Sequence, residues 1–347
     1  MNIFEKYKDY VIFSSIKKEL SIVYFTYNEN YVAIHTNRPE WLNWAFDSNF
    51  LCNNCKNGNL IGKITIYFDE NLFEKRYDYD TYADGEFVLK SHPMYVEGVT
   101  NSFFEIEDLE IHVFHYPRKI ISINNKRSFE FSSFVCTKED LIRESLYGIK
   151  KILSRYNHYK GVFSIHAAAL SRNEKGYLFL SGSRVGKSTL FVNLFFDGFE
   201  PINDDIVFWS YKHGKIVIHG CATLPQLRKN TFDAIIPHKS MPTDNLLEYQ
   251  SNFNYYSLYG CKLNKRTPLD AIFIPQFGYA KSSIERIKNL DVFKKELRAC
   301  IAHGNYEIDE SFLEAIKSLN AVPTFKFCMS ADYNEVCSTL NNFLVKL

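Results

Sequence analysis

The strongest structural constraint in this sequence is a short apolar segment that runs directly into a loop containing Gly-Lys-Ser. Residues 177–180, Tyr-Leu-Phe-Leu, have the length and composition of a buried strand. Residues 181–189 follow as Ser-Gly-Ser-Arg-Val-Gly-Lys-Ser-Thr, and apolar residues then recur at helical spacing through residues 190–195. A strand, a glycine-containing loop and a helix in this order predict an α/β arrangement in which the loop leads into the helix N-terminus.

This loop has the composition of a phosphate-binding P-loop. In such loops the backbone N–H groups and the helix N-terminus bind phosphate oxygens, while a lysine reaches the β- and γ-phosphates. Lys187 fits that role, Ser188 offers a hydroxyl to Mg²⁺, and Gly186 lets the backbone approach the phosphate. The strict pattern has glycine five residues before Gly186, where this chain has Ser181. The expected phosphate contacts come from Ser183, Arg184, Val185, Gly186, Lys187, Ser188 and Thr189.

Two adjacent carboxylates follow the loop. Asp204 and Asp205 directly precede an apolar segment, residues 206–209, that we expect to be a strand. One carboxylate of such a pair can bind Mg²⁺ while the other accepts the proton of an attacking hydroxyl. The sequence Asn-Asp-Asp is equally typical of an Asx turn that opens a strand. The pair alone leaves both interpretations open.

A histidine precedes the loop on another apolar segment. His166 lies within residues 161–170, beside the small residues Ala167, Ala168 and Ala169. A single histidine in such a segment is usually a hydrogen-bonded core residue. Its interpretation therefore depends on which other residues the fold brings to it.

The first part of the chain has a different pattern. Short extended segments separated by turn signals predict a β-rich N-terminal domain over residues 1–135. The clearest of these segments are residues 63–68, 87–89, 109–114 and 119–123. Residues 104–110 are acidic, and we expect them to form a solvated strand edge without acid/base chemistry.

The pattern changes at Thr137. Thr137-Lys-Glu-Asp140 is a helix-start signature, and apolar residues then recur at helical spacing to about Tyr156. The sequence therefore predicts two domains, the β-rich domain over residues 1–135 and a nucleotide-binding domain over residues 136–347.

Composition excludes several classes of protein. Lys and Arg number 41 against 40 Asp and Glu, so the net charge of +1 provides no general attraction to nucleic acid or to an anionic membrane. No segment approaches the roughly 18 consecutive apolar residues of a membrane-spanning helix. Residues 1–10 mix charged with apolar side chains, unlike a signal peptide, so we expect a cytoplasmic protein. The eight cysteines are dispersed, and the single pair Cys52 and Cys55 lacks the second pair of a structural zinc site.

Three segments together resemble one family. His166-Ala-Ala-Ala-Leu, Ser183-Arg-Val-Gly-Lys-Ser-Thr-Leu and Asn203-Asp-Asp-Ile-Val resemble, in order and spacing, the HPr kinase-like family. The likeness covers residues 138–347 and is greatest to the HPr kinase-related branch, which contains lasso-peptide-type kinases. It implies an α/β (or α+β) P-loop kinase core that is also similar to phosphoenolpyruvate carboxykinase. The chain departs from HPr kinase itself, which has Gly at the position of Arg184 and Glu at that of Thr189.

The resemblance also implies an activity. Its members use ATP and Mg²⁺ to transfer the γ-phosphoryl group to a hydroxyl, and in this branch we expect a Ser of a peptide or protein. Small hydroxylated metabolites such as serine, a polyol or a sugar are alternative acceptors, and a non-catalytic nucleotide-binding regulator is another alternative. Relatives often form oligomers, so a homo-oligomer is possible.

Site residues are implied in the same way. Lys187 binds phosphate, Ser188 and Asp204 bind the metal, and Asp204 and Asp205 divide metal contact and base between them. The resemblance places His166 near the phosphates. Arg228 either neutralises the transferred charge or is an ordinary surface residue.

Overall fold

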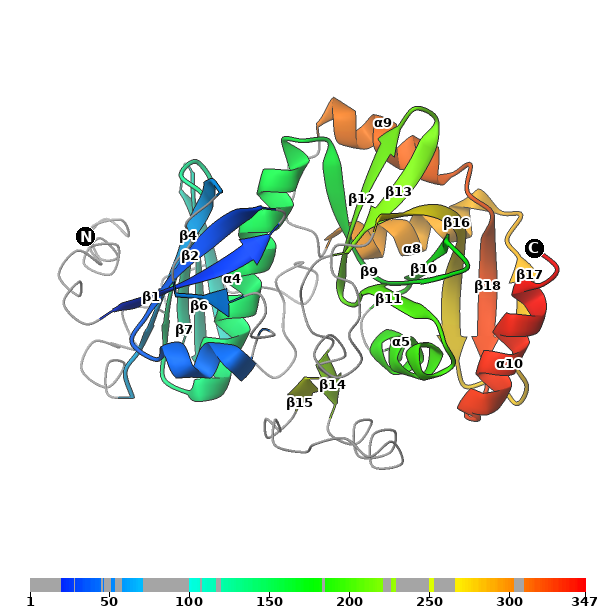
Figure 1. The fold of residues 1–347 in the computed structure, drawn as a ribbon, viewed down its shortest axis with the longest axis horizontal. Helices are drawn as coiled ribbons and strands as arrows, with labels where there is room; N and C mark the ends of the chain where they lie inside the picture. The colour runs from blue at the N-terminus through cyan, green and yellow to red at the C-terminus, as the bar shows by residue number, and fades with distance from the viewer. Residues whose placement is uncertain are drawn as a thin grey trace. The chain divides into compact units, whose positions relative to one another are not determined.

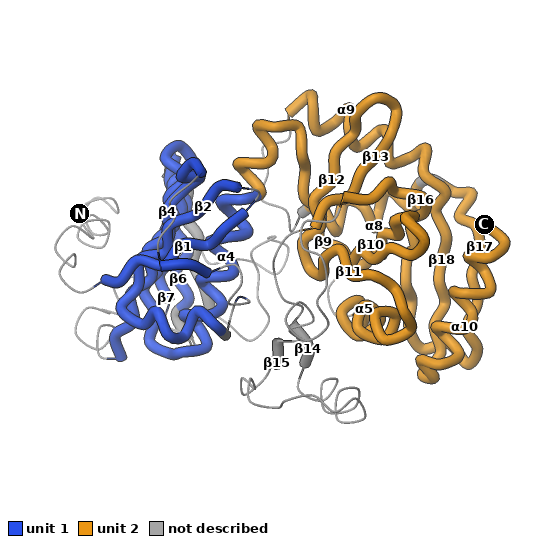
Figure 2. Tube along the Cα trace, in the orientation of Figure 1, with its two compact units in different colours: residues 1–153 blue, residues 154–347 orange. Residues whose placement is uncertain are grey.

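The computed structural model divides the chain into two compact units, Met1–Leu153 and Ser154–Leu347 (Figure 2). The structure describes residues 20–27, 29–44, 46, 51–53, 58–70, 100–106, 108–116, 120–182, 185–220, 226–228, 250–252, 266–302 and 309–347. Residues 1–10, Cys55 and the strand expected at 87–89 lie outside these ranges. None of the described helices has both the length and the apolar character needed to cross a membrane.

The two units divide within helix α4 (Lys138–His158), whereas the sequence pattern divides the chain after residue 135. The helix begins where its signature predicts, because the Thr137 hydroxyl accepts a hydrogen bond from the Asp140 amide at 3.1 Å. Most of α4 then packs on the first sheet. At Gly148 an added Cβ would lie 2.6 Å from the ring of Phe131 in that sheet, so helix and strand approach closely. This packing assigns most of the helix to the first unit.

The first unit contains one eight-stranded sheet, in the order β3-β1-β2-β4-β8-β7-β6-β5. Its strands are β1 (Ser21–Tyr27), β2 (Asn30–Thr36), β3 (Leu51–Cys52), β4 (Leu60–Phe68), β5 (Thr100–Ile106), β6 (Leu109–Tyr116), β7 (Ile120–Asn125) and β8 (Glu130–Val135). The central pairs β2–β4 and β4–β8 are parallel, and the other pairs are antiparallel. A 3-10 helix, η2 (Pro39–Trp44), follows β2.

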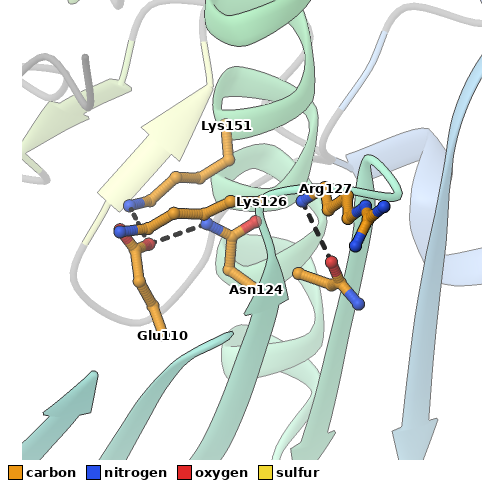
Figure 3. Close-up of polar contacts among 6 residues, drawn as sticks. Glu110, Asn124, Lys126, Arg127 and Lys151 are labelled. Carbon is orange, nitrogen blue, oxygen red and sulfur yellow. Dashed lines mark hydrogen bonds and ion pairs between the residues drawn. The ribbon is translucent and has the colours of Figure 1, made fainter. Parts of the chain in front are cut away.

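The prediction that residues 104–110 form a solvated strand edge is wrong for Glu110. It lies on β6, an interior strand, and Figure 3 shows three side chains converging on its carboxylate. Lys151 of α4 approaches to 3.1 Å, Lys126 to 3.2 Å, and Asn124 donates a hydrogen bond at 2.7 Å. Burial alone would raise the pKa of Glu110, but Lys151, Asn124 and Lys126 together lower it to about 2. The carboxylate therefore joins the sheet to α4.

The second unit contains an eight-stranded sheet in the order β10-β9-β12-β13-β16-β18-β17, with β11 paired to β9 and an additional pairing of β10 with β16, and a separate two-stranded sheet of β14 and β15 (Figure 1). Its strands are β9 (Val162–Arg172), β10 (Lys175–Leu180), β11 (Glu200–Asn203), β12 (Ile206–Lys212), β13 (Lys215–His219), β14 (Gln226–Arg228), β15 (Gln250–Asn252), β16 (Arg266–Phe277), β17 (Ser283–Arg286) and β18 (Thr324–Met329). The first parts of β9 and β16 pair with β12 and β13. Their later parts pair with β10, which runs parallel to β16.

Helices cover both faces of this second unit. They are α5 (Lys187–Phe196), α8 (Leu290–Ala302), α9 (Glu310–Leu319) and α10 (Tyr333–Leu344). Helices α8 and α9 pack with Leu178 and Ile272 in one apolar core. The neighbouring strand residue Phe273 instead contacts Phe343 of α10, with ring centroids 6.1 Å apart. Because successive strand residues face opposite sides, α8 and α10 lie on opposite faces of the sheet.

The position of strand β10 is set by its turn from β9 and by its close approach to β16. It follows β9 through a two-residue turn in which Asn173 and Glu174 have φ of 53° and 64°. Positive φ at both positions is the geometry that matches the twist of an antiparallel hairpin. At Gly176 an added Cβ would lie 2.5 Å from the carbonyl oxygen of Pro268, so only glycine allows β10 to approach β16 this closely. The strand that presents the loop is therefore fixed on both sides.

Candidate active site

Three parallel strands end at the same edge of the sheet. Strand β16 runs parallel to both β10 and β18. Strand β10 leads into the loop and α5, and β18 leads into α10. The carboxyl ends of parallel strands are the usual position of ligand sites in α/β folds, because the following loops and helix N-termini face the ligand there. This edge is where the sequence predicts phosphate binding.

Gly186 provides the backbone turn into α5. It is the N-cap residue, with φ 85° and ψ 20°, and its carbonyl accepts a hydrogen bond from the Leu190 amide at 2.9 Å. A side chain is strained in this left-handed conformation. Among the described residues, an added Cβ would have only the Tyr333 hydroxyl within 4 Å, at 3.8 Å. The predicted contacts Ser183 and Arg184 lie outside the described residues, whereas Val185 and Thr189 are described and only partly buried.

Lys187 is turned toward its own loop. Its ammonium donates hydrogen bonds to the carbonyl oxygens of Ser181, at 2.8 Å, and Gly182, at 2.9 Å. The side chain is buried, and this burial lowers the pKa of Lys187. Asp204 and Asp205 are among the nearby groups that oppose the shift. The lysine therefore lies near both carboxylates, as the predicted site requires.

Asp204 and Asp205 interrupt a strand that otherwise continues along β9. Asn203 pairs with Ala169 and Ile206 pairs with His166, so two residues separate the paired positions on each strand. The Ile206 amide donates to the Asp204 carbonyl at 3.0 Å, which closes a three-residue γ-turn around Asp205. The φ of Asp205 is 73°, the strained form of this turn.

The side-chain bond of Asn203 is not that of an Asx turn, in which the side-chain oxygen accepts a backbone N–H. The Asn203 side-chain amide donates to the Ile206 carbonyl and spans the two aspartates. That bond therefore does not use either carboxylate.

The Asp204 carboxylate is fully buried at this edge. Its residue is 1% exposed, and neither carboxylate oxygen makes a hydrogen bond of ordinary geometry with the described residues. Burial raises the pKa of Asp204 to about 6, although hydrogen bonding from Ser188 and the charge of Lys187 oppose the shift. A fully buried carboxylate with such weak hydrogen bonding is unfavourable unless a cation or a proton neutralises it. Its surroundings therefore fit a divalent cation.

His166 faces the second carboxylate. Its Nε2 lies 3.4 Å from Oδ1 of Asp205, with side-chain exposures of 14% for the histidine and 43% for the aspartate. The strand pairing positions both groups, because the Ala167 amide donates to the Asp205 carbonyl at 3.1 Å. The neighbour on which the interpretation of His166 depends is therefore Asp205, and a role for His166 at the site stays a prediction.

Helix α8 adds two residues that the motif does not contain. The thiol of buried Cys300 donates to the Ser181 carbonyl at 3.5 Å, so Ser181 accepts from both Cys300 and Lys187. Burial raises the pKa of Cys300 to about 11, which keeps it a neutral thiol. Glu296 lies one turn earlier on α8. Its negative charge is one of those that oppose the lowering of the Lys187 pKa by burial. No motif signals these residues, since α8 lies about a hundred residues after the loop.

Two further predictions concern Arg228 and the metal ligands. Arg228 ends β14, and its side chain lies outside the described residues, so the structure does not place it at the site. No cluster of three or more His, Cys, Asp and Glu side chains arranged to hold a metal ion occurs in the described part of the chain. Mg²⁺ at phosphotransfer sites is usually bound by one or two carboxylates together with substrate phosphates, so Asp204 and Ser188 still fit it.

Comparisons with known proteins give only distant similarity, and it comes from solved structures. No family model matches the sequence. No curated protein matches it. Among solved structures, the HPr(Ser) kinase/phosphatase from Coxiella burnetii matches with 11% sequence identity and a TM-score of 0.31. That match covers 53% of this chain and 97% of the other chain.

Proposed function

We propose that this protein is an ATP- and Mg²⁺-dependent kinase that transfers the γ-phosphoryl group to a hydroxyl, with a Ser of a peptide or protein as the acceptor. The observation that carries the proposal is the buried carboxylate of Asp204 beside Lys187 and Ser188 at the loop. A site that bound only phosphate would gain nothing from a buried negative charge there. A cation held between carboxylate and phosphate explains it.

The residues divide the work of phosphoryl transfer. Lys187 leaves its loop carbonyls and stabilises negative charge on the β- and γ-phosphates. Asp204 and the Ser188 hydroxyl hold the metal, whose charge neutralises the phosphate oxygens. Because Asp204 and Ser188 are fixed by the β11–β12 turn and by α5, these two residues need little rearrangement when nucleotide binds, whereas the Lys187 side chain must turn.

Asp205 is the proposed base. It is more exposed than Asp204, and therefore within reach of an acceptor hydroxyl. His166 orients its carboxylate from β9, and the strained turn fixes the backbone beneath it. The hydroxyl proton passes to Asp205 as the oxygen attacks the γ-phosphorus in line with the departing ADP oxygen.

The test is transfer of label from γ-labelled ATP. The purified full-length protein is incubated with Mg²⁺ and labelled ATP in an extract of its own organism, and the products are separated by size. We expect label in a peptide or protein with the wild type, and none with Lys187→Ala or Asp205→Asn. Label in the small-molecule fraction would replace the peptide acceptor by a metabolite. ATP binding with no transfer to any fraction would favour a nucleotide-binding regulator.

A further inference from the structure

A tyrosine from the end of the chain lies at the phosphate-binding loop. Tyr333 is the first residue of α10, and its hydroxyl lies 3.8 Å from the position that a Cβ on Gly186 would occupy. Burial raises the pKa of Tyr333, while a hydrogen bond with the Thr189 side chain opposes the shift. The phenol is therefore a neutral hydroxyl held against the first turn of α5.

A second aromatic ring, that of Phe277, packs on Tyr333 on the side away from the loop. We call these two side chains the aromatic wall. Phe277 is the last residue of β16, and its ring stacks on Tyr333 with centroids 6.2 Å apart and an interplanar angle of 30°. Phe277 is 48% exposed. The strand pairing accounts for its position, because Phe277 pairs with Met329 at the end of β18, just before α10 begins. An exposed aromatic surface therefore lies at the same sheet edge as the phosphate loop.

Folding does not explain this exposed surface. Helix α10 is anchored by buried Val336, Cys337 and Leu340. Its first amides are capped by the Asp332 carboxylate, which accepts from Asn334 and Glu335. Neither the cap nor these anchors involves the Phe277 ring. The half-exposed face of this ring lies beside the loop and is accessible to a bound ligand.

The order of groups along a nucleotide matches this arrangement. In a P-loop the lysine reaches the β- and γ-phosphates, so the backbone further into the helix faces the phosphate next to the ribose. Thr189 lies in that part of the helix, and Tyr333 lies against it. From Tyr333 to Phe277 the wall changes from a hydroxyl to an apolar ring. A nucleotide changes in the same order, from phosphate to base.

We propose that Tyr333 and Phe277 form the nucleoside side of the site, with the Tyr333 hydroxyl contacting the phosphate next to the ribose and the exposed face of Phe277 stacking on the base. This inference rests on the proposed function, since it assumes a nucleotide at the loop. Stacking on one aromatic ring is worth roughly 10- to 100-fold in affinity per base. A single neutral hydrogen bond is worth roughly two- to tenfold.

The test compares ATP with tripolyphosphate, which lacks the nucleoside, by calorimetry on the full-length protein. Phe277→Ala should weaken ATP binding roughly 10- to 100-fold and leave tripolyphosphate binding unchanged. Tyr333→Phe should weaken both ligands by a similar, smaller factor. Phe277→Trp should retain ATP affinity, and its fluorescence should be quenched by ATP and not by tripolyphosphate. The matched control is Tyr279→Ala, which removes another exposed aromatic side chain that follows β16.

The outcomes separate this inference from the proposed function. If wild-type protein binds tripolyphosphate through Lys187 but Phe277→Ala binds ATP normally, the aromatic wall is not the base site and the phosphate site stands. The same conclusion follows if Phe277→Ala weakens ATP and tripolyphosphate equally, because a general loss of structure would then explain both. If the wild type binds neither ligand, the proposed function fails and this inference fails with it.

Discussion

The Nε2 atom of His166 lies 3.4 Å from Oδ1 of Asp205, although His166 precedes the phosphate loop on β9 and Asp205 follows it in the turn between β11 and β12. The pairing of β9 with β12 brings them together, and the turn at Asp205 directs the carboxylate outward from the sheet edge. The deeper carboxylate of Asp204 faces Lys187 and Ser188 instead. Adjacent residues thereby acquire different surroundings, which is the basis of the following predictions.

Asp205→Asn should abolish proton acceptance without disturbing the fold. Asparagine tolerates the positive φ of this turn, so the backbone should remain in place. We expect phosphoryl transfer to fall at least about 100-fold, with ATP affinity within about threefold of the wild type. Turnover with labelled ATP and calorimetry measure the two quantities. Unchanged turnover would show that another group accepts the proton.

Asp204→Asn should stabilise the protein while removing activity. The pKa of Asp204 is about 6 in the fold against an ordinary value of 3.8, so the folded state resists its ionisation. The resulting destabilisation is absent below about pH 4, grows as the pH rises toward 6, and is complete above it. Removing the charge should therefore raise the free energy of unfolding by about 3 kcal/mol near pH 8 and change it little near pH 4.

Urea denaturation without divalent cations measures this difference. Asp205→Asn is the matched control, because that carboxylate is 43% exposed and its replacement should change the stability by less than about 0.5 kcal/mol. A second readout is Mg²⁺ in the presence of tripolyphosphate, which should raise the melting temperature of the wild type and not that of Asp204→Asn. A gain in stability that is equal near pH 4 and near pH 8 would contradict the buried charge.

The elements around the loop are predictable from the sequence, because short stretches of neighbouring residues determine them. The strand, loop and α5 follow from apolar pattern and glycine position, and α4 begins at the capping signature of Thr137. Glu110 was misjudged because its surroundings depend on Lys151, which lies 41 residues later on a helix that packs across the sheet. Tyr333 and Cys300 were missed for the same reason. Long-range packing brings them to the loop, and no local pattern carries that information.

Gly186→Ala should be strained, whereas Gly182→Ala should not. Alanine at φ 85° is disfavoured by about 1 kcal/mol, although no atom would obstruct its Cβ within 3.4 Å. Gly182 has no atom within 4 Å of an added Cβ and needs no positive φ. Thermal unfolding without nucleotide should therefore separate the two variants. Equal stabilities would mean that the loop relaxes to another backbone conformation.

Glu110→Gln should weaken the first unit in a pH-dependent way. The pKa of Glu110 is lowered from 4.5 to about 2, so its ion pairs stabilise the fold above about pH 4.5 and lose this effect as the pH falls toward 2. Because solvent reaches part of the side chain, screening reduces the expected loss to ~1–2 kcal/mol at neutral pH. Denaturation near pH 7 and near pH 3 should show a smaller loss at the lower pH. Asp108→Asn, at an exposed neighbour, is the control and should have little effect at either pH.

The two-residue spacing between Asn203 and Ile206 restricts how the length of this chain can change. Both flanking positions pair with β9, and Val207 and Trp209 beyond the turn are buried in the core. Inserting or deleting one residue would send these side chains to the opposite face of the sheet. Only a change that preserves the odd-even alternation would keep the core intact. Homologues that fold in this way should therefore keep the length of this turn, even where the residues around it differ.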